Sequence, residues 1–162
     1  MILPKHHITG EQLVTDTIHE SQFQPCGVDL TLKAAYKFTS AGKIDFDNKE
    51  RKLSEVEEVK FENNEMHLPQ GSYKVVYGEF VRIPKDAAAF VYPRSSLLRC
   101  GATVESAVWD PGYEGRGEAM LVVHNPHGIK FKKNAKIAQM VFVRLSEAAK
   151  HLYDGQYKGE NK

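Results

Sequence analysis

The chain has 162 residues, which suits one compact domain and is too short for two full ones. Hydrophobic residues make up 41% and charged residues 27%, a globular composition that excludes a disordered or fibrous chain. Lys and Arg (22) nearly balance Asp and Glu (21), so the formal net charge of +1 does not indicate a nucleic-acid-binding surface.

The apolar runs of the sequence are short. Residues 120–123 and 140–143 are among the longest, far below the ~20 residues of a membrane span, and residues 1–7 do not resemble a secretory signal. Cys26 and Cys100 lie far apart and match no paired-cysteine motif. We therefore expect a cytoplasmic protein with no membrane or nucleic-acid partner.

The N-terminal segment, residues 1–23, carries a helix signal. Thr9-Gly10-Glu11-Gln12 matches a capping box and predicts a helix from Thr9 to about His19. A turn at residues 24–27 ends this segment. From residue 28 to 39, apolar residues alternate with polar ones, which predicts a β-strand.

Residues 45–65 are acidic, and we interpret them as a solvated loop with an edge strand rather than an acidic binding site. Residues 73–77 and 80–83 flank Gly78-Glu79 and predict a hairpin. Further strands are predicted at residues 88–92, 103–109, 119–124 and 137–145, with a helical turn at 94–100. Many short strands separated by turns indicate an all-β antiparallel sandwich or barrel.

Two segments combine charged and turn-forming residues. Ser95 and Ser96 follow Arg94 at a predicted helix start. This pattern fits an anion site made by the serine hydroxyls and the guanidinium. It fits equally well a Ser95 that only caps the helix. Asp110-Pro111-Gly112 reads as a turn, and an ordinary hairpin with a capping Asp is the plain interpretation. The neighbouring Tyr113 suggests a second interpretation, in which the aromatic ring supports a ligand while Asp110 performs acid–base chemistry.

The C-terminal residues 153–162 lack apolar periodicity and are expected to be mobile unless a ligand orders them. Tyr157 and Lys158 stand between Gly155 and Gly159, and this pattern fits a segment that closes over an anion. A disordered terminus is the alternative.

Five segments in this order resemble the dUTPase/dCTP deaminase superfamily, and most closely the archaeal-type dUTPases of its dCTP deaminase branch. They are residues 24–30 (QPCGVDL), 93–101 (PRSSLLRCG), 109–117 (WDPGYEGRG), 134–142 (NAKIAQMVF) and 153–159 (YDGQYKG). The N-terminal helix and the acidic stretch fall outside the resemblance.

The resemblance implies one domain over residues 1–162, with a flexible C-terminal segment at 151–162 that reaches over the nucleotide. The implied fold is a jelly-roll or distorted β-barrel with a short N-terminal helix and one short internal helix. It also implies a homotrimer with sites between subunits. The implied substrate is a deoxynucleoside triphosphate with Mg²⁺, and the triphosphate and water, rather than protein ligands, are expected to hold the metal.

The resemblance also implies roles for individual residues. Asp110 falls where the family places the carboxylate that activates water, and Tyr113 where an aromatic ring packs on the deoxyribose, with Trp109 and Val108 on the sugar and base side. The phosphate binders would be Arg94, Ser95, Ser96 and Gln139, with Asp29 supporting the metal–phosphate region. Arg99 matches an arginine of the deaminase branch. The residues expected to cover the nucleotide are Tyr153, Tyr157, Lys158 and Gly159.

The deaminases of this superfamily carry a Glu on the strand after the Asp-Pro-Gly segment. The corresponding position here is Val122, which cannot move a proton, and Glu118 is the nearby carboxylate, expected at a solvated strand edge. We therefore expect hydrolysis of dUTP to dUMP and pyrophosphate. The alternatives are a dCTP deaminase, alone or bifunctional, a non-catalytic homologue that binds deoxynucleoside triphosphates, and a β-domain without a ligand.

Overall fold

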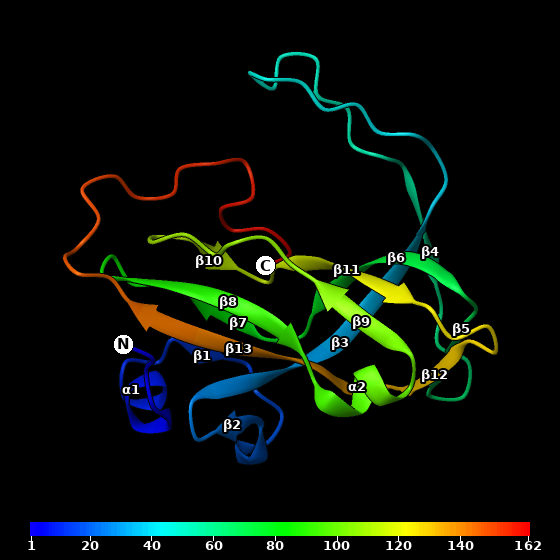
Figure 1. The fold of residues 1–162 in the computed structure, drawn as a ribbon, viewed down its shortest axis with the longest axis horizontal. Coiled ribbons are helices and arrows are strands. Elements are labelled where there is room, and N and C mark those ends of the chain that lie inside the picture. Colours follow the sequence, from blue (N-terminus) through cyan, green and yellow to red (C-terminus); the bar gives the residue numbers. More distant parts are fainter.

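The structure is a computed structural model that describes all residues, 1–162, and it consists mainly of strands (Figure 1). Its helices are α1 (Lys5–Gly10), the 3-10 helix η1 (Glu20–Gln22) and α2 (Ser95–Arg99). Its strands are β1 (Val14–Thr15), β2 (Phe23–Gln24), β3 (Gly27–Phe38), β4 (Val56–Val59), β5 (Glu65–Leu68), β6 (Gly71–Tyr77), β7 (Phe80–Arg82), β8 (Ala87–Pro93), β9 (Ala102–Glu105), β10 (Glu114–Gly115), β11 (Glu118–Val123), β12 (Ile129–Lys132) and β13 (Lys136–Arg144).

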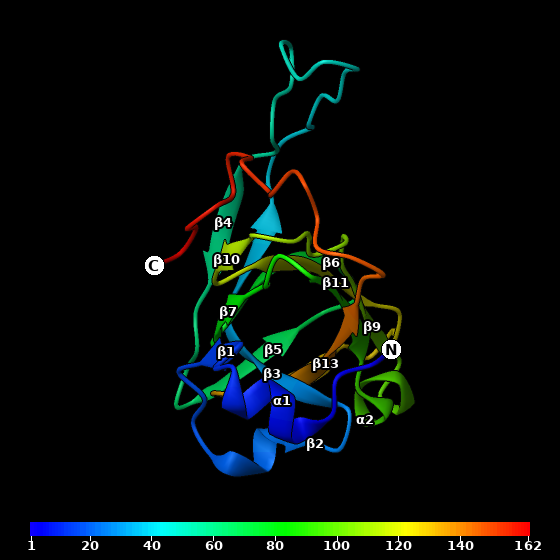
Figure 2. The same ribbon diagram turned by 90° about the vertical axis from the view of Figure 1, so that its left-hand side faces the viewer.

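The main sheet has the strand order β8-β13-β3-β6-β11-β9, with β2 and β4 also paired to β3. All of its pairs are antiparallel, and the sheet curls into a nearly closed barrel (Figure 2). Two backbone hydrogen bonds of 3.0 Å between Ala89 and Trp109 join the two ends of the sheet. The predicted all-β barrel is confirmed.

Strand β3 lies at the centre of this sheet. Val28, Leu30 and Leu32 alternate along it and are buried in the core, as the sequence pattern predicts. Asp29 and Thr31 point to the other face and are buried as well. Glu79 covers Thr31, and Gln24, Arg94 and Lys136 cover Asp29, so a carboxylate is held buried on this face of the sheet.

The hairpin predicted around Gly78-Glu79 is wrong. Strand β6 pairs with β3 and β11, whereas β7 pairs with β1 and β10 in a second, three-stranded sheet. The side chain of Glu79 is 0% exposed and accepts hydrogen bonds from Gln22 Nε2 (2.7 Å), Thr31 N (2.9 Å) and Thr31 Oγ1 (2.7 Å). These bonds draw the connection inward, so the chain crosses between sheets instead of turning back.

The helix predicted from Thr9 to about His19 is also wrong, because α1 ends at Gly10. Thr9 Oγ1 donates to the Lys5 carbonyl oxygen (3.1 Å) within α1 and does not cap a later helix. Val14 pairs with Val81 in the second sheet and is buried there. Burial of Val14 in a strand therefore overrides the local capping signal.

Two segments project from the barrel. Residues 39–55, here called the arm, extend outward between β3 and β4 (cyan in Figure 1), and β4 is the edge strand expected in the acidic stretch. Residues 146–162, here called the tail, return from β13 to the loop at residues 111–116. Within this structure no helix is long and apolar enough to cross a membrane.

Candidate active site

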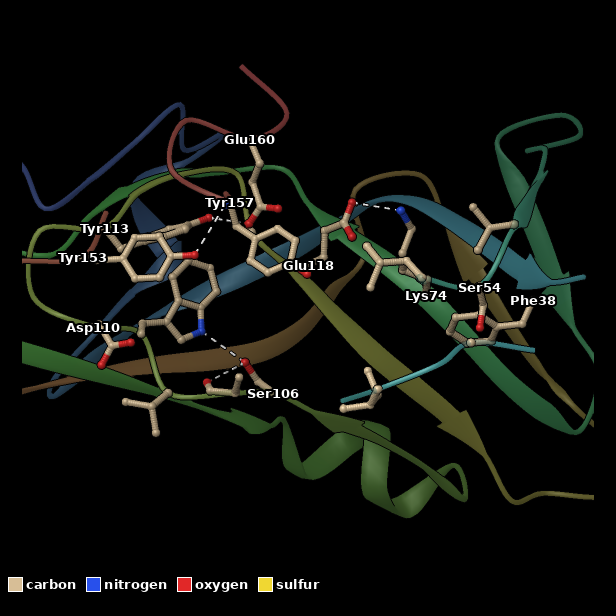
Figure 3. Close-up of a pocket in the computed structure, with 18 of the residues that line it drawn as sticks. Phe38, Ser54, Lys74, Ser106, Asp110, Tyr113, Glu118, Tyr153, Tyr157 and Glu160 are labelled. Carbon is tan, nitrogen blue, oxygen red and sulfur yellow. Dashed lines mark hydrogen bonds and ion pairs between the residues drawn. The ribbon is translucent and has the colours of Figure 1, made fainter. Parts of the chain in front are cut away.

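A cavity of about 600 Å³ lies where the arm, the tail, the strands β6 and β11 and the loop at 106–113 meet (Figure 3). Figure 3 shows Tyr113, Tyr153, Tyr157 and Glu160 together on one side, with Phe38 and Ser54 at the other end. The loop contributes Ser106, Ala107, Val108, Trp109, Asp110 and Tyr113. The three residues assigned to the sugar and base, Tyr113, Trp109 and Val108, thus share the cavity with Asp110, which is assigned to catalysis.

Trp109 anchors this loop. Strand β9 ends at Glu105, earlier than predicted, and the indole N–H of Trp109 donates to Ser106 Oγ (3.1 Å). The Trp109 and Tyr113 rings meet edge to face with centroids 5.0 Å apart. A Cβ on Gly117 would lie 2.2 Å from the Trp109 ring, so glycine is required there. The buried indole therefore fixes the loop that carries Asp110.

Asp110 is exposed and lines the cavity, and its carboxylate makes no hydrogen bond or ion pair. The turn that follows it is closed by its backbone, since Tyr113 N donates to the Asp110 carbonyl oxygen (3.1 Å). The interpretation of Asp110 as a capping side chain is thus wrong. A carboxylate without a protein partner is free to accept a proton from water.

Tyr113 lies next to Asp110 in the chain but is only 7% exposed. Its hydroxyl donates to Glu160 Oε1 (2.7 Å) in the tail. Burial, together with the Glu160 carboxylate, raises the pKa of Tyr113, so the phenol is neutral. Burial also raises the pKa of Glu160, and the nearby Glu118 adds to this, whereas the Tyr113 hydrogen bond opposes it.

Glu118 does not occupy the solvated edge position expected from the sequence. It lines the cavity, pairs with Lys74 Nζ (3.0 Å) and accepts a hydrogen bond from Asn161 Nδ2 (3.3 Å). Val122 pairs with Thr103 and Ser72 farther along β11 and is not part of the lining. Glu118 is therefore the β11 carboxylate that faces the cavity.

A second group of candidate residues gathers around Asp29, and we call it the Asp29 cluster: Gln24, Asp29, Arg94, Lys136 and Gln139. Asp29 is 2% exposed, and Arg94 Nε and Lys136 Nζ each lie 3.4 Å from its Oδ2 atom. Gln24 Nε2 donates to the same atom (3.1 Å), and Gln139 is the β13 partner of Asp29 in the sheet register. Two cations around one carboxylate leave a net positive charge that suits an anion.

Ser95 and Ser96 begin α2 directly beside this cluster. Arg94 occupies the N-cap position and no side chain caps the helix, so Ser95 is not the cap. Both serines are exposed, and their hydroxyls are available to a ligand. Arg99, at the end of α2, is exposed and makes no ion pair.

The predicted site residues fall into two places in one chain. Of the four tail residues expected to cover the nucleotide, Tyr153 and Tyr157 line the cavity, whereas Lys158 and Gly159 do not. Glu160, which received no role from the sequence, lines it as well. Gly159 instead anchors the tail, with its N–H donating to the Glu114 carbonyl oxygen (2.7 Å). The cavity lining also excludes Ser95, Ser96, Arg99 and the Asp29 cluster.

Sequence reasoning missed several contacts. Gln24 and Lys136 lie in segments that carry the family resemblance but received no role. Lys74 lies on a strand with no distinguishing pattern, and its partner Glu118 is 44 positions away. Only the fold reveals such pairs.

Comparison with known proteins identifies the family. A profile of dCTP deaminase-like domains matches residues 3–145. A protein of Methanosarcina mazei named probable deoxyuridine 5'-triphosphate nucleotidohydrolase is 51% identical over 143 residues, 88% of this chain and 84% of that protein. One of the same name from Archaeoglobus fulgidus is 49% identical over 155 residues, 95% of this chain and 91% of that protein.

A third relative, the deoxyuridine 5'-triphosphate nucleotidohydrolase of Methanocaldococcus jannaschii, is 46% identical over 146 residues, 89% of this chain and 92% of that protein. Among solved structures, the 2'-deoxycytidine 5'-triphosphate deaminase of Agrobacterium tumefaciens has the same fold, with a TM-score of 0.67 and 19% identity. The match covers 90% of this chain and about half (49%) of that one. The chain belongs to the dCTP deaminase-like family.

Proposed function

We propose that this protein hydrolyses dUTP to dUMP and pyrophosphate. The relatives named as dUTP nucleotidohydrolases match most of this chain at about half identity, which supports this substrate. The observation that carries the proposal is the free carboxylate of Asp110 beside Trp109 and Tyr113 in one cavity.

In the proposed reaction, Asp110 accepts a proton from a water molecule that attacks the α-phosphorus. The bond from the α-phosphorus to the bridging oxygen breaks, and pyrophosphate leaves with the bonding electrons. Because the phosphate oxygens repel a nucleophile, this step needs positive charge and hydrogen-bond donors around them. The Arg94 guanidinium, the Ser95 and Ser96 hydroxyls and the Gln139 amide would supply these, with Asp29 orienting Arg94.

The residues fit a magnesium ion that arrives with the triphosphate. In residues 1–162, no group of three or more His, Cys, Asp or Glu side chains gathers as a metal cage, and Asp29 already faces two cations. Mg²⁺ commonly keeps waters and binds substrate phosphates. When bound, it would neutralise charge on the phosphate oxygens.

We propose that the protein is a homotrimer in which the Asp29 cluster of one subunit faces the cavity of another. The separation of these groups within one chain supports this arrangement. So do exposed apolar side chains on β8, α2 and the loop after β9, namely Phe90, Tyr92, Leu98 and Val108. Light scattering would test it, with a molar mass of three chains expected and that of one chain contradicting it.

Deamination of dCTP is a second candidate, because Glu118 lies in the same cavity as Asp110. Its carboxylate is already engaged by Lys74 and Asn161, whereas that of Asp110 has no partner. We therefore favour hydrolysis. The cytoplasmic location stays a prediction of the sequence.

The test is to incubate the protein with Mg²⁺ and dUTP, dCTP or dTTP separately and to identify the products by chromatography. We expect dUMP and pyrophosphate from dUTP. Ammonia released from dCTP would instead establish a deaminase. Binding of dUTP without turnover would identify a non-catalytic homologue and contradict the proposal.

A further inference from the structure

Two segments outside the barrel form much of the cavity wall. The arm contributes Gly42, Ile44, Lys52, Leu53 and Ser54, and the tail contributes Tyr153, Tyr157 and Glu160. Neither segment contains a helix or a strand, and the arm has only an isolated bridge between Lys43 and Lys52. What holds them in place therefore decides the shape of the cavity on this side.

The two ends of the tail's final stretch are bound by the loop at 111–116. Tyr153 N donates to the Pro111 carbonyl oxygen (2.8 Å), and Arg116 N donates to the Glu160 carbonyl oxygen (3.1 Å). Between these anchors, Lys158 N bonds to Gly155 O (3.1 Å) and thus stays within the tail. Residues 154–158 therefore receive no backbone hydrogen bond from the rest of the protein.

Arg51 of the arm reaches this middle stretch. Its Nη2 atom donates to Gln156 Oε1, and its Cζ atom lies 5.9 Å from the centroid of the Tyr157 ring. This is the one side-chain hydrogen bond to residues 154–158 from outside the tail. Guanidinium groups bind amide oxygens and aromatic faces well, so one side chain holds two tail residues.

None of the other three arm cations, Lys43, Lys49 and Lys52, forms a side-chain bond to the tail. Lys43 pairs with Glu50, and Lys49 Nζ pairs with Asp47 (2.6 Å), so both are engaged by acids of the arm itself. Arg51, like Lys52, has no acidic partner in the arm, but it alone among the arm cations contacts the tail. This difference singles out Arg51 within the charged arm and supplies a matched control.

We infer that the arm is the docking surface for the tail, and that Arg51 is a positioning residue which orders residues 154–158 as a wall of the nucleotide cavity. With the tail docked, the cavity has a volume of about 600 Å³, so the tail encloses the space without filling it. A wall ordered before the ligand arrives lowers the entropy cost of binding. The effect on dUTP binding rests on the proposed function.

The first test needs no substrate. Hydrogen exchange of tail amides is compared in the ligand-free protein, in Arg51→Ala and in Lys49→Ala, which removes the same charge two residues away. We expect exchange at the amides of Tyr157 and Lys158, the two in this stretch that are hydrogen-bonded, to become about 3- to 10-fold faster in Arg51→Ala only. Arg51→Lys, which keeps the cation but loses the fork of donors, is expected to be intermediate. Unchanged exchange in Arg51→Ala, or equal changes in both alanine variants, would overturn the inference.

The second test is steady-state kinetics with dUTP. Because Arg51 does not touch Asp110, we expect KM to rise about 3- to 10-fold in Arg51→Ala while kcat changes less than about twofold. A lower KM would show that the docked tail obstructs the cavity, and an unchanged KM would show that it is no functional wall; both overturn the inference. If the unaltered protein does not hydrolyse dUTP, the proposed function fails, while the exchange experiment still decides whether the arm holds the tail.

Discussion

Asp29 and Asp110 are two aspartates that the protein surrounds in opposite ways. Asp29 is buried within paired strands, with Arg94 and Lys136 each 3.4 Å from one carboxylate oxygen. Asp110 is exposed on a loop fixed by Trp109, and its carboxylate has no partner. The Asp29 carboxylate is bonded to other side chains of the protein, whereas the Asp110 carboxylate is available to water or a ligand.

This difference separates positioning from chemistry. A buried carboxylate whose oxygen is bonded to cations is engaged in orienting those partners. A carboxylate at the edge of a cavity contacts water and can take its proton. We therefore assign orientation of Arg94 to Asp29 and proton transfer to Asp110.

The largest expected effect comes from Asp110→Asn. The amide cannot accept the proton, so kcat should fall roughly 10²- to 10⁴-fold, while a non-hydrolysable dUTP analogue still binds. Kinetics and calorimetric titration measure the two quantities. Asp86→Asn, which alters a surface pair with Arg144 outside the cavity, serves as the control and should retain turnover. Undiminished turnover in Asp110→Asn would reject its assignment as the base.

Deleting residues 153–162 should have the next largest effect. The deletion removes Tyr153 and Glu160 from the cavity and uncovers Tyr113, so turnover should fall on the order of 10²-fold. The barrel strands are untouched, and the oligomeric state should not change. Light scattering beside the activity assay checks both, and dissociation of the oligomer on truncation would contradict this account of the tail.

Asp29→Asn sharpens the comparison because, unlike Asp110→Asn, it should lower the stability of the fold. The substitution leaves Arg94 and Lys136 without their counter-charge, although both reach solvent in part. The free energy of unfolding should therefore fall by about 1–3 kcal/mol, as measured by urea denaturation. Asp110→Asn should leave this free energy nearly unchanged. Equal stability losses in the two variants would erase the distinction between the aspartates.

The smallest expected effect concerns the pH dependence of Glu160. Because its pKa is raised in the folded protein, its contribution to stability is complete below the ordinary carboxyl pKa and is lost as pH rises through the raised value. Relative to Glu160→Gln, the unaltered protein should lose less than about 0.5 kcal/mol over this range, since water screens a half-buried group. Thermal unfolding across pH measures the loss, with Glu147→Gln as an exposed control. A gain in stability with rising pH would contradict the burial of Glu160.

Most of the longer strands and the turn that follows Asp110 were predictable from the sequence for a physical reason. Alternation in β3 and the Asp-Pro-Gly turn before Tyr113 are local patterns, and the fold keeps them. Gly78-Glu79 shows the limit of such patterns: it resembles an exposed turn, but Glu79 is buried by Gln22 and Thr31, at separations of 57 and 48 residues. Local signals contain no information about these partners.

The same limit applies to the site. The segments around Asp29, Arg94 and Asp110 carry family motifs, so their residues could be singled out. The contacts of Glu118 with Lys74 and of Arg51 with Gln156 span 44 and 105 residues and follow no spacing rule. The arm has no motif at all, and only its position beside the tail connects it to the cavity.

The most direct test of the central claim is an experimental structure of the protein with a non-hydrolysable dUTP analogue and Mg²⁺. The account predicts that the Asp110 carboxylate lies about 2.6–3.2 Å from a water molecule facing the α-phosphorus. It also predicts that the Tyr113 ring lies against the deoxyribose and that Arg94 contacts the phosphates. An Asp110 side chain turned away from the triphosphate at every occupied site would contradict it.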